Sequence, residues 1–253
     1  MKTVLITGAS SGFGWAMARL FAAQGYRLIL IARRQERLDV LKAQLESEAQ
    51  AKVYIQCCDV RNQVEVENVL QVLPTEWRSI DVLINNAGLA KGKAPIHEMS
   101  FDHMNQMIDT NVKGLLHVTK TVAQWMIERQ SGTIINIGSI AGKETYPGGN
   151  AYSASKFAVD ALTKSMRIDL LPYGIRVGQI APGAANTEFS TVRFDGDSAI
   201  VDNVYKGFDP LLAEDIAEAA YFMASRPAHV CINDMVIMPT AQANATNFHR
   251  KNT

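Results

Sequence analysis

A tyrosine and a lysine four positions apart are the residues of this chain best suited to proton transfer. Tyr152 and Lys156 lie in a stretch with helical periodicity, so both side chains should project from one face of a helix. A phenol with an ordinary pKa of about 10 exchanges protons poorly near neutral pH. A neighbouring ammonium group stabilises the phenolate and lowers that pKa. The spacing therefore predicts Tyr152 as a general acid or base, with Lys156 as its electrostatic partner.

Two further polar residues are expected near this pair. Ser139 follows an apolar run, and ligands bind at the carboxyl ends of parallel strands, so Ser139 is expected to hydrogen-bond a substrate oxygen. Asn111 lies inside a long predicted helix, where asparagine is a poor helix former, which indicates a polar task such as holding water near Lys156. Each residue alone also fits a structural role, but together they predict one catalytic cleft.

A glycine-rich turn follows the first apolar run of the chain, where residues 7–14 have the sequence TGASSGFG. Glycine permits a sharp turn and a close approach of pyrophosphate to the backbone, while the N–H groups at a helix N-terminus bind the anion. A plain strand-to-helix turn would also use glycine. At the first such turn, we expect a dinucleotide site formed by Gly8, Ser10, Ser11, Gly12, Phe13 and Gly14.

Two arginines end the second predicted strand, where NAD-binding domains carry an acidic residue. Arg33 and Arg34 can pair with a ribose 2′-phosphate that a carboxylate would repel, so they predict NADP(H) as the cofactor. The alternative is a solvated basic helix start that continues to Arg37, although cations there oppose the helix dipole. Asp59 and Val60 follow the third predicted strand and are expected at the adenine, but Asp59 could equally cap the next helix.

The elements that must position these residues alternate between short apolar runs and amphipathic stretches. The runs predict parallel strands at 4–7, 28–32, 53–57, 82–85, 133–137, 175–180 and 232–237. Helices are predicted at 15–24, 36–48, 63–73, 101–128, 151–171 and 213–224. This alternation predicts one α/β domain over 1–253 with a Rossmann-type, doubly wound, seven-stranded parallel sheet. Residues 1–100 would bind the nucleotide, and 101–240 would carry catalysis and the substrate loop.

Two stretches interrupt this alternation. Residues 184–210 have weak periodicity, and a connection of that length in a compact domain is typical of a lid or binding loop. The tail from 239 to 253 is polar and aperiodic, and we expect it either to be frayed or to dock, through residues 241–253, on a partner subunit. In the docked case, residues 245–250, a polar stretch with one aromatic residue, would reach a neighbouring active site.

Composition excludes several classes of partner. The chain carries 25 Lys and Arg against 25 Asp and Glu, which leaves no net field to attract nucleic acid or anionic lipid. No apolar stretch approaches the roughly 18 residues of a membrane span, so we expect a cytoplasmic protein. The histidines are scattered without metal-ligand spacing, which predicts no metal site. Cys57, Cys58 and Cys231 also lack such spacing and are expected to be buried, inert thiols.

In order and spacing, these motifs resemble the short-chain dehydrogenase/reductase superfamily over essentially the whole chain. The resemblance rests on the glycine turn, Asn111, Ser139, the Tyr152–Lys156 pair, Asn85-Asn86-Ala87-Gly88 and Pro182-Gly183 with Thr187. It implies a catalytic tetrad of Asn111, Ser139, Tyr152 and Lys156, and hydride transfer between a nicotinamide and a substrate carbonyl. It further implies cofactor contacts from Asn86, Ala87, Gly88, Tyr152, Lys156, Pro182, Gly183, Ala185 and Thr187. Taken alone, residues 85–88 would also fit a plain turn.

Within that superfamily, residues 33–38, 187–194 and 227–230 resemble NADP-dependent 3-hydroxy acid dehydrogenases of the serine type and sulfoacetaldehyde reductases. Both groups act on small anions. Arg193 lies in the long loop, and its guanidinium could clamp a carboxylate or sulfonate through two parallel hydrogen bonds. Arg193 is therefore the expected anion anchor. The alternative is a surface salt bridge to Glu188 or Asp195.

The loop between Ser139 and Tyr152 is expected to face the substrate, and it carries Lys143, Tyr146 and Asn150. A sulfonate has three oxygens and accepts a further donor, which favours sulfoacetaldehyde, reduced to isethionate. Serine, allo-threonine and 3-hydroxypropionate remain alternative substrates. A non-catalytic NADPH-sensing protein and a reductase of larger ketones are further alternatives. The resemblance also implies a homotetramer in which helices 101–128 and 151–171 pack across a two-fold interface.

Overall fold

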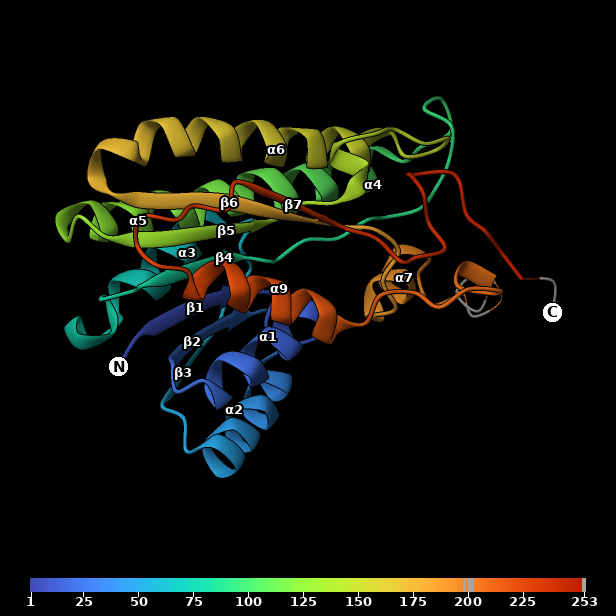
Figure 1. Ribbon diagram of the computed structural model, residues 1–253. Coiled ribbons are helices and arrows are strands. Elements are labelled where there is room, and N and C mark those ends of the chain that lie inside the picture. Colours follow the sequence, from blue (N-terminus) through green and yellow to red (C-terminus); the bar gives the residue numbers. More distant parts are fainter. Residues whose placement is uncertain (198, 200–202, 252–253) are drawn as a thin grey trace.

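The computed structural model describes residues 1–197, 199 and 203–251. Within these residues the strands form one parallel sheet in the order β3-β2-β1-β4-β5-β6-β7, which confirms the predicted architecture (Figure 1). Position 198 and residues 200–202 of the predicted loop, and the last two positions of the tail, lie outside the described residues. The strands are β1 Thr3–Thr7, β2 Arg27–Ala32, β3 Val53–Cys57, β4 Val82–Asn85, β5 Gly132–Ile137, β6 Ile175–Pro182 and β7 Asp234–Ile237.

Helices cover both faces of the sheet (Figure 1). One layer contains α1 Gly12–Ala23, α2 Gln35–Ala49 and α9 Ala213–Ser225. The other contains α3 Gln63–Gln71, α4 Phe101–Ile108, α5 Leu115–Glu128 and α6 Asn150–Leu170. The short helix α7 Glu188–Arg193 lies beyond the end of the sheet, near the C-terminal end of the chain.

Alternation along the buried strands divides the core into two clusters. Val4 and Ile6 of β1 pack in the cluster beneath α1 and α9, whereas Leu5 between them packs in the cluster beneath α3 and α5. This follows because successive side chains of a strand point to opposite faces of the sheet. All three side chains are fully buried, so the strand is apolar throughout. The carboxyl ends of β1, β4 and β5 are thereby held in register at one edge.

Several predicted elements differ from the structure in their bounds or in their regularity. The first helix begins at Gly12 rather than at residue 15, inside the glycine turn. The last strand begins at Asp234, although the Asn233 carbonyl still accepts a hydrogen bond from the Gln179 amide. The predicted helix 101–128 is continuous but contains a π-helical segment, Asp109–Gly114, between α4 and α5. Apolar periodicity does not reveal one wider turn within a long helix.

The tail is ordered against its own chain. Gln242 and Phe248 form an antiparallel bridge, and the Phe248 and Phe208 rings lie 5.2 Å apart. The Lys251 amide donates to the Gly207 carbonyl. The described tail is therefore not frayed, and docking on a partner subunit stays a prediction.

The expectation that all cysteines are buried is wrong. Cys58 is buried, whereas Cys57 and Cys231 are exposed, because each lies where a strand end meets a surface turn. Among the described helices, none has both the length and the apolar character needed to cross a membrane.

Candidate active site

A cavity of about 570 Å³ lies at the carboxyl edge of the sheet, between the glycine turn, α6 and α7. It brings together most of the residues predicted from the sequence. The predicted cofactor residues that line it, besides Tyr152 and Lys156, are Gly8, Ser10, Ser11, Gly12, Phe13, Arg33, Arg34, Asp59, Val60, Asn86, Ala87, Gly88, Pro182, Gly183, Ala185 and Thr187. Ser139, Tyr146 and Arg193 also line it, whereas Gly14, Asn111 and Asn150 do not.

The glycine turn is shaped for an anion. Gly8 and Gly12 have φ angles of +67° and +51°, a conformation that favours glycine. Gly14 lies behind the cavity, where an added Cβ would be 2.3 Å from the Gly8 carbonyl oxygen, so only glycine lets α1 pack this closely. Ser11, which precedes α1, makes no side-chain cap, and the first turn of α1 contains no acidic residue. The free N–H groups of that turn fit a pyrophosphate.

Arg34 is held at the end of this turn. Its Nε and Nη2 atoms donate to the Ser10 hydroxyl at 3.2 and 3.1 Å, and Nη2 also donates to the Ser11 hydroxyl at 2.8 Å. Its Nη1 atom donates to the Glu188 carboxylate at 3.1 Å. Arg33 is more open, with one nitrogen 4.0 Å from Asp59. The two guanidinium groups at this end of the cavity fit a ribose 2′-phosphate.

Asp59 does not cap the following helix, so that alternative is wrong. The Asn62 side chain accepts the capping hydrogen bond of α3 from the Glu65 amide, while Asp59 binds the side chain and the amide of Arg61. Although burial raises the pKa of the Asp59 carboxyl, its hydrogen bonds with Arg61 outweigh burial and lower it. Asp59 is therefore ionised at the cavity wall.

Asn86 joins the end of β4 to the glycine turn. Its side-chain amide donates to the carbonyl oxygens of Thr7 and Gly8 at 2.9 and 3.2 Å. The Thr7 hydroxyl in turn accepts from the backbone amides of Asn86 and Ala87 at 3.0 Å each. These reciprocal bonds hold residues 86–88 against the cavity, which a plain turn would not require.

Tyr152 and Lys156 lie on one face of α6, as predicted, and are only 8% and 6% exposed. The Lys156 ammonium donates to the Ile137 carbonyl at 2.9 Å and lies 5.9 Å from the centre of the Tyr152 ring. Burial lowers the pKa of Lys156 to about 8.

The expected lowering of the Tyr152 pKa is wrong for the chain by itself. Burial raises the pKa of Tyr152 to about 12, and a hydrogen bond with Ser139 and the charge of Arg193 offset only part of this increase. Desolvation prevails because the lysine ammonium is turned towards a backbone carbonyl and is not in contact with the phenol oxygen. The phenol is therefore fully protonated at neutral pH.

Ser139 is fixed at the end of β5. Its hydroxyl accepts from the Ala141 amide at 3.1 Å and opens a short 3₁₀ turn, Ile140–Gly142. An added Cβ on Gly142 would lie 2.5 Å from the Lys156 carbonyl, so this turn packs directly on α6. Backbone packing thus holds the Ser139 hydroxyl near the Tyr152 phenol, whose pKa it lowers.

Asn111 lies in the π-helical segment and is 2% exposed. Its Oδ1 atom accepts from the Leu89 amide at 2.8 Å, and its Nδ2 atom donates to the Leu89 carbonyl at 2.9 Å and to the Ser155 hydroxyl at 3.0 Å. It therefore positions the backbone beside Gly88 and does not line the cavity. Its role in holding water near Lys156 stays a prediction. π-Helical turns are frequent at functional sites.

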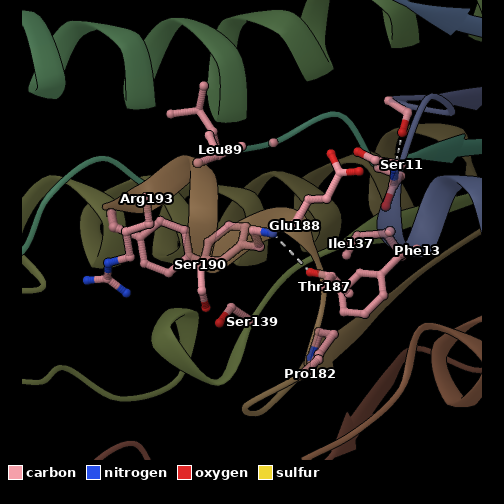
Figure 2. A pocket seen from close by; sticks show the side chains of 18 of the residues that line it. Ser11, Phe13, Leu89, Ile137, Ser139, Pro182, Thr187, Glu188, Ser190 and Arg193 are labelled. Atoms are coloured by element: carbon pink, nitrogen blue, oxygen red, sulfur yellow. Dashed lines mark hydrogen bonds between the residues drawn. The ribbon is translucent and has the colours of Figure 1, made fainter. Parts of the chain in front are cut away.

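Arg193, the last residue of α7, points into the cavity at the end opposite Ser11, with Glu188 and Ser139 between them (Figure 2). Its Nε atom donates to the Gly92 carbonyl at 3.0 Å and its Nη2 atom to the Tyr146 hydroxyl at 2.9 Å. The guanidinium lies 5.7 Å from the centre of the Tyr152 ring. Among the described residues, Arg193 does not form the alternative salt bridge to Glu188 or Asp195.

Two residues expected to face the substrate do not. The Asn150 side chain donates to the Ala94 carbonyl at 2.6 Å, because this residue begins α6 on the outer side of the loop. The Lys143 ammonium forms ion pairs with Asp160 and Asp234 behind the Ser139 turn. Both side chains satisfy structural partners that are distant in the sequence.

The cavity also contains residues that the sequence did not assign to this chain's own site. Phe189 and Tyr205 line its outer part, and Gln242, Phe248 and Arg250 come from the tail. The only sequence signal for the tail was its aromatic residue within a polar stretch. No group of three metal-binding side chains occurs among the residues that the structure describes.

Comparison with known proteins agrees with this geometry. A family model described as short chain dehydrogenase matches residues 2–197. The chain belongs to the short-chain dehydrogenase family. This membership confirms the family that the motifs indicated.

Individual relatives in the family have two kinds of name. The NADP-dependent 3-hydroxy acid dehydrogenase YdfG of Escherichia coli (strain K12) is 45% identical over 98% of this chain and 99% of that protein. Sulfoacetaldehyde reductase 2 of Chromohalobacter salexigens is 46% identical over 95% of each. A solved structure of serine dehydrogenase, in its closed form with NADP+, matches with a TM-score of 0.93 at 45% identity, covering 98% of this chain and all of that one.

Proposed function

We propose that this protein is an NADP(H)-dependent oxidoreductase that interconverts a small anionic aldehyde and its alcohol, with sulfoacetaldehyde and isethionate as the preferred pair. The observation that carries the proposal is the position of Arg193, whose guanidinium points into the cavity beside Tyr146 and the Tyr152 ring. An anion held there places its carbonyl near the phenol. Relatives named for two small anionic substrates support the same class.

NADP(H) suits the opposite end of the cavity. Arg33 and Arg34 would hold the 2′-phosphate and the glycine turn the pyrophosphate, and when bound the cofactor supplies or accepts a hydride at the nicotinamide. The solved relative that matches with a TM-score of 0.93 was determined with NADP+.

Proton transfer falls to Tyr152. Since burial keeps its pKa at about 12, the phenol is protonated at neutral pH and can donate to a carbonyl oxygen as that oxygen gains negative charge. Ser139, hydrogen-bonded to the phenol, orients it. Lys156 stabilises the phenolate that remains, since its own pKa of about 8 leaves it largely protonated at neutral pH. Asn111 contributes by holding the backbone beside Gly88.

Two anions compete for the assignment. A sulfonate has three oxygens and can accept from Arg193 and Tyr146 together, which favours sulfoacetaldehyde. The planar fork of Arg193 equally suits a carboxylate, and the match to serine dehydrogenase favours a 3-hydroxy acid as the second candidate.

Substitution of the anion anchor tests this function. Arg193→Ala should raise KM for sulfoacetaldehyde and malonate semialdehyde by about 30-fold or more, since charge-assisted pairs contribute roughly 2 kcal/mol. The KM for propionaldehyde, which is uncharged and of similar size, should change by less than about threefold. NADPH oxidation followed at 340 nm gives each value.

Arg193→Lys is the matched control, because it keeps the charge but loses the fork and should fall between the two. Equal increases in KM for charged and uncharged aldehydes would show that Arg193 is not the anion anchor. If the unaltered protein binds NADPH but oxidises it with no aldehyde tested, the alternative of a non-catalytic NADPH-sensing protein would be favoured. The ratio of kcat/KM for sulfoacetaldehyde and malonate semialdehyde in the unaltered protein decides between the two anions.

We also propose a homotetramer built on α4, α5 and α6. These helices expose Phe101, Leu116, Phe157 and Ile168, an unusual number of large apolar side chains for a solvated layer. Phe157→Glu should reduce the mass measured by light scattering, and an unchanged mass would exclude this face as the interface.

A further inference from the structure

Helix α7 joins two charged contacts at opposite ends of the cavity. Its first residue, Glu188, binds Arg37 through Oε1 and Arg34 through Oε2, the latter at 3.1 Å. Its last residue, Arg193, binds the Gly92 carbonyl and the Tyr146 hydroxyl. In Figure 2 the Glu188 side chain is directed away from Arg193 and towards the end that contains Ser11. The helix therefore spans from the predicted cofactor end to the predicted substrate end.

One of the two arginines that hold Glu188, Arg34, is also expected at the 2′-phosphate. Arg34 already uses Nε and Nη2 on the Ser10 and Ser11 hydroxyls, which leaves Nη1 for the carboxylate. Although burial raises the pKa of Glu188, its hydrogen bonds with Arg37 and Arg34 outweigh burial and lower it. The carboxylate is therefore ionised whenever the arginine cluster is formed.

Charge balance permits Glu188 and a phosphate to share this cluster. Arg33, Arg34 and Arg37 supply positive charge, while Glu188 supplies one negative charge. The remaining guanidinium, Arg33, has only a distant contact with Asp59, at 4.0 Å. A phosphate monoester carrying nearly two negative charges would complete the balance without displacing Glu188.

We propose that Glu188 is a positioning residue that ties α7 to the arginine cluster of the NADP(H) site and thereby sets Arg193 in place for the substrate anion. At a rise of about 1.5 Å per residue, the ends of α7 are only about 8 Å apart, so releasing one end displaces the other. In this proposal Glu188 acts through Arg193 and makes no contact of its own with the anion or the reacting carbonyl. The inference rests on the proposed function, because Arg193 must be the anchor for the kinetic effect to appear.

The kinetic test is a double-substitution cycle with Glu188→Gln and Arg37→Gln. Glu188→Gln should raise KM for the anionic aldehyde by about fivefold, the size of a pair of partly exposed ion pairs, and Arg37→Gln, which leaves the Arg34 pair in place, by about twofold. In each variant kcat should change by less than about twofold. The double variant should lose no more than Glu188→Gln alone, because the Arg37–Glu188 pair is already absent in that variant. In about 1 M NaCl, where the Debye length is about 3 Å, the difference from the unaltered protein should largely disappear.

Asp195→Asn is the matched control, because Asp195 lies two residues after α7 in the same predicted loop but pairs with Lys91. It should leave KM within about twofold. An unchanged KM for Glu188→Gln, additive losses in the double variant, or an equal rise for propionaldehyde would each overturn the inference.

A measurement without substrate separates this inference from the proposed function. With NADPH bound, backbone amides of residues 188–194 should exchange about fivefold faster in Glu188→Gln than in the unaltered protein, while Asp195→Asn matches the unaltered protein. If Arg193→Ala affects charged and uncharged aldehydes alike but exchange is still faster in Glu188→Gln, then Glu188 does hold α7 in place and the proposed anionic substrate is wrong. Unchanged exchange in Glu188→Gln overturns the tether.

Discussion

Two carboxylates near the cavity are each held by two cations: Asp160 of α6, the helix that carries Tyr152 and Lys156 and is called the floor below, and Glu188 of α7, which is called the lid. In the floor, Asp160 of α6 pairs with Lys143 and Lys164 and accepts from Gln179, and its side chain is 12% exposed. In the lid, the Glu188 side chain is 41% exposed and pairs with two arginines. Both carboxylates therefore pair with two cations, but the Asp160 side chain is much more buried than the Glu188 side chain.

Burial decides what each cluster does. Although desolvation raises the pKa of Asp160, hydrogen bonds with Lys143, Lys164 and Gln179 outweigh it and lower that pKa to about 2. Asp160 lies on the same helix as Tyr152, and Lys143 follows the Ser139 turn, so this cluster fastens the catalytic parts together. The lid cluster is half open to water, where such pairs add little stability but can still hold a short helix in place.

From this comparison we infer that the floor carries the reaction and the lid selects the substrate. Substitutions in the floor should affect every substrate alike, whereas substitutions in the lid should separate charged from uncharged substrates. The following experiments test that division, from the largest expected effect to the smallest.

Tyr152→Phe should lower kcat by about 10³-fold for charged and uncharged aldehydes alike, because it removes the proton donor and leaves the anion anchor in place. NADPH binding, measured by fluorescence titration, should be retained within about threefold.

Tyr146→Phe is the control, because the Tyr146 hydroxyl accepts a hydrogen bond from Arg193 and is not the proposed proton donor. It should raise KM for the anionic aldehyde without a comparable loss of kcat. A Tyr152→Phe variant that keeps turnover would end both the proton-transfer assignment and the division between floor and lid.

The sequence predicted the floor well because its signals are local. Apolar runs predict the strands, the spacing of Tyr152 and Lys156 places them on one helix face, and Gly8 and Gly12 lie in a turn that requires positive φ. The direction of the Tyr152 pKa shift was not predictable, since it depends on burial by residues distant in the sequence.

The lid was less predictable because its contacts join distant parts of the chain. Glu188 meets Arg34, which lies 154 positions earlier, and Phe248 of the tail meets Phe208. Lys143, expected near the substrate, instead meets Asp234, 91 positions away. No local sequence pattern encodes such pairings. The sequence could therefore show that the lid carries charged residues, but it could not show which residues they pair with.

Asp160→Asn should destabilise the fold by about 2 kcal/mol at pH 7, the value of a pKa shift from 3.8 to about 2. Because the folded carboxyl has the lowered pKa, its stabilisation is present above about pH 4 and is lost as pH falls towards 2. Urea denaturation at pH 7, 4 and 3 should show the difference between variant and unaltered protein shrinking as pH falls.

Asp234→Asn provides the control for this effect, since Asp234 pairs only with Lys143 among the described residues and its side chain is 39% exposed. This substitution should lower the free energy of unfolding by less than about 1 kcal/mol. Equal losses in the two variants would show that burial does not distinguish these two carboxylates.

Glu188→Gln should change the free energy of unfolding by less than about 0.5 kcal/mol, the smallest effect expected here, because both of its ion pairs are partly exposed and screened by salt. The same urea denaturation at pH 7 measures it. A loss as large as that of Asp160→Asn would mean that the lid cluster supports the fold, and the contrast between the two carboxylates would then disappear. A small loss accompanied by faster exchange in α7 would instead show that an ion cluster can position a helix without stabilising the domain.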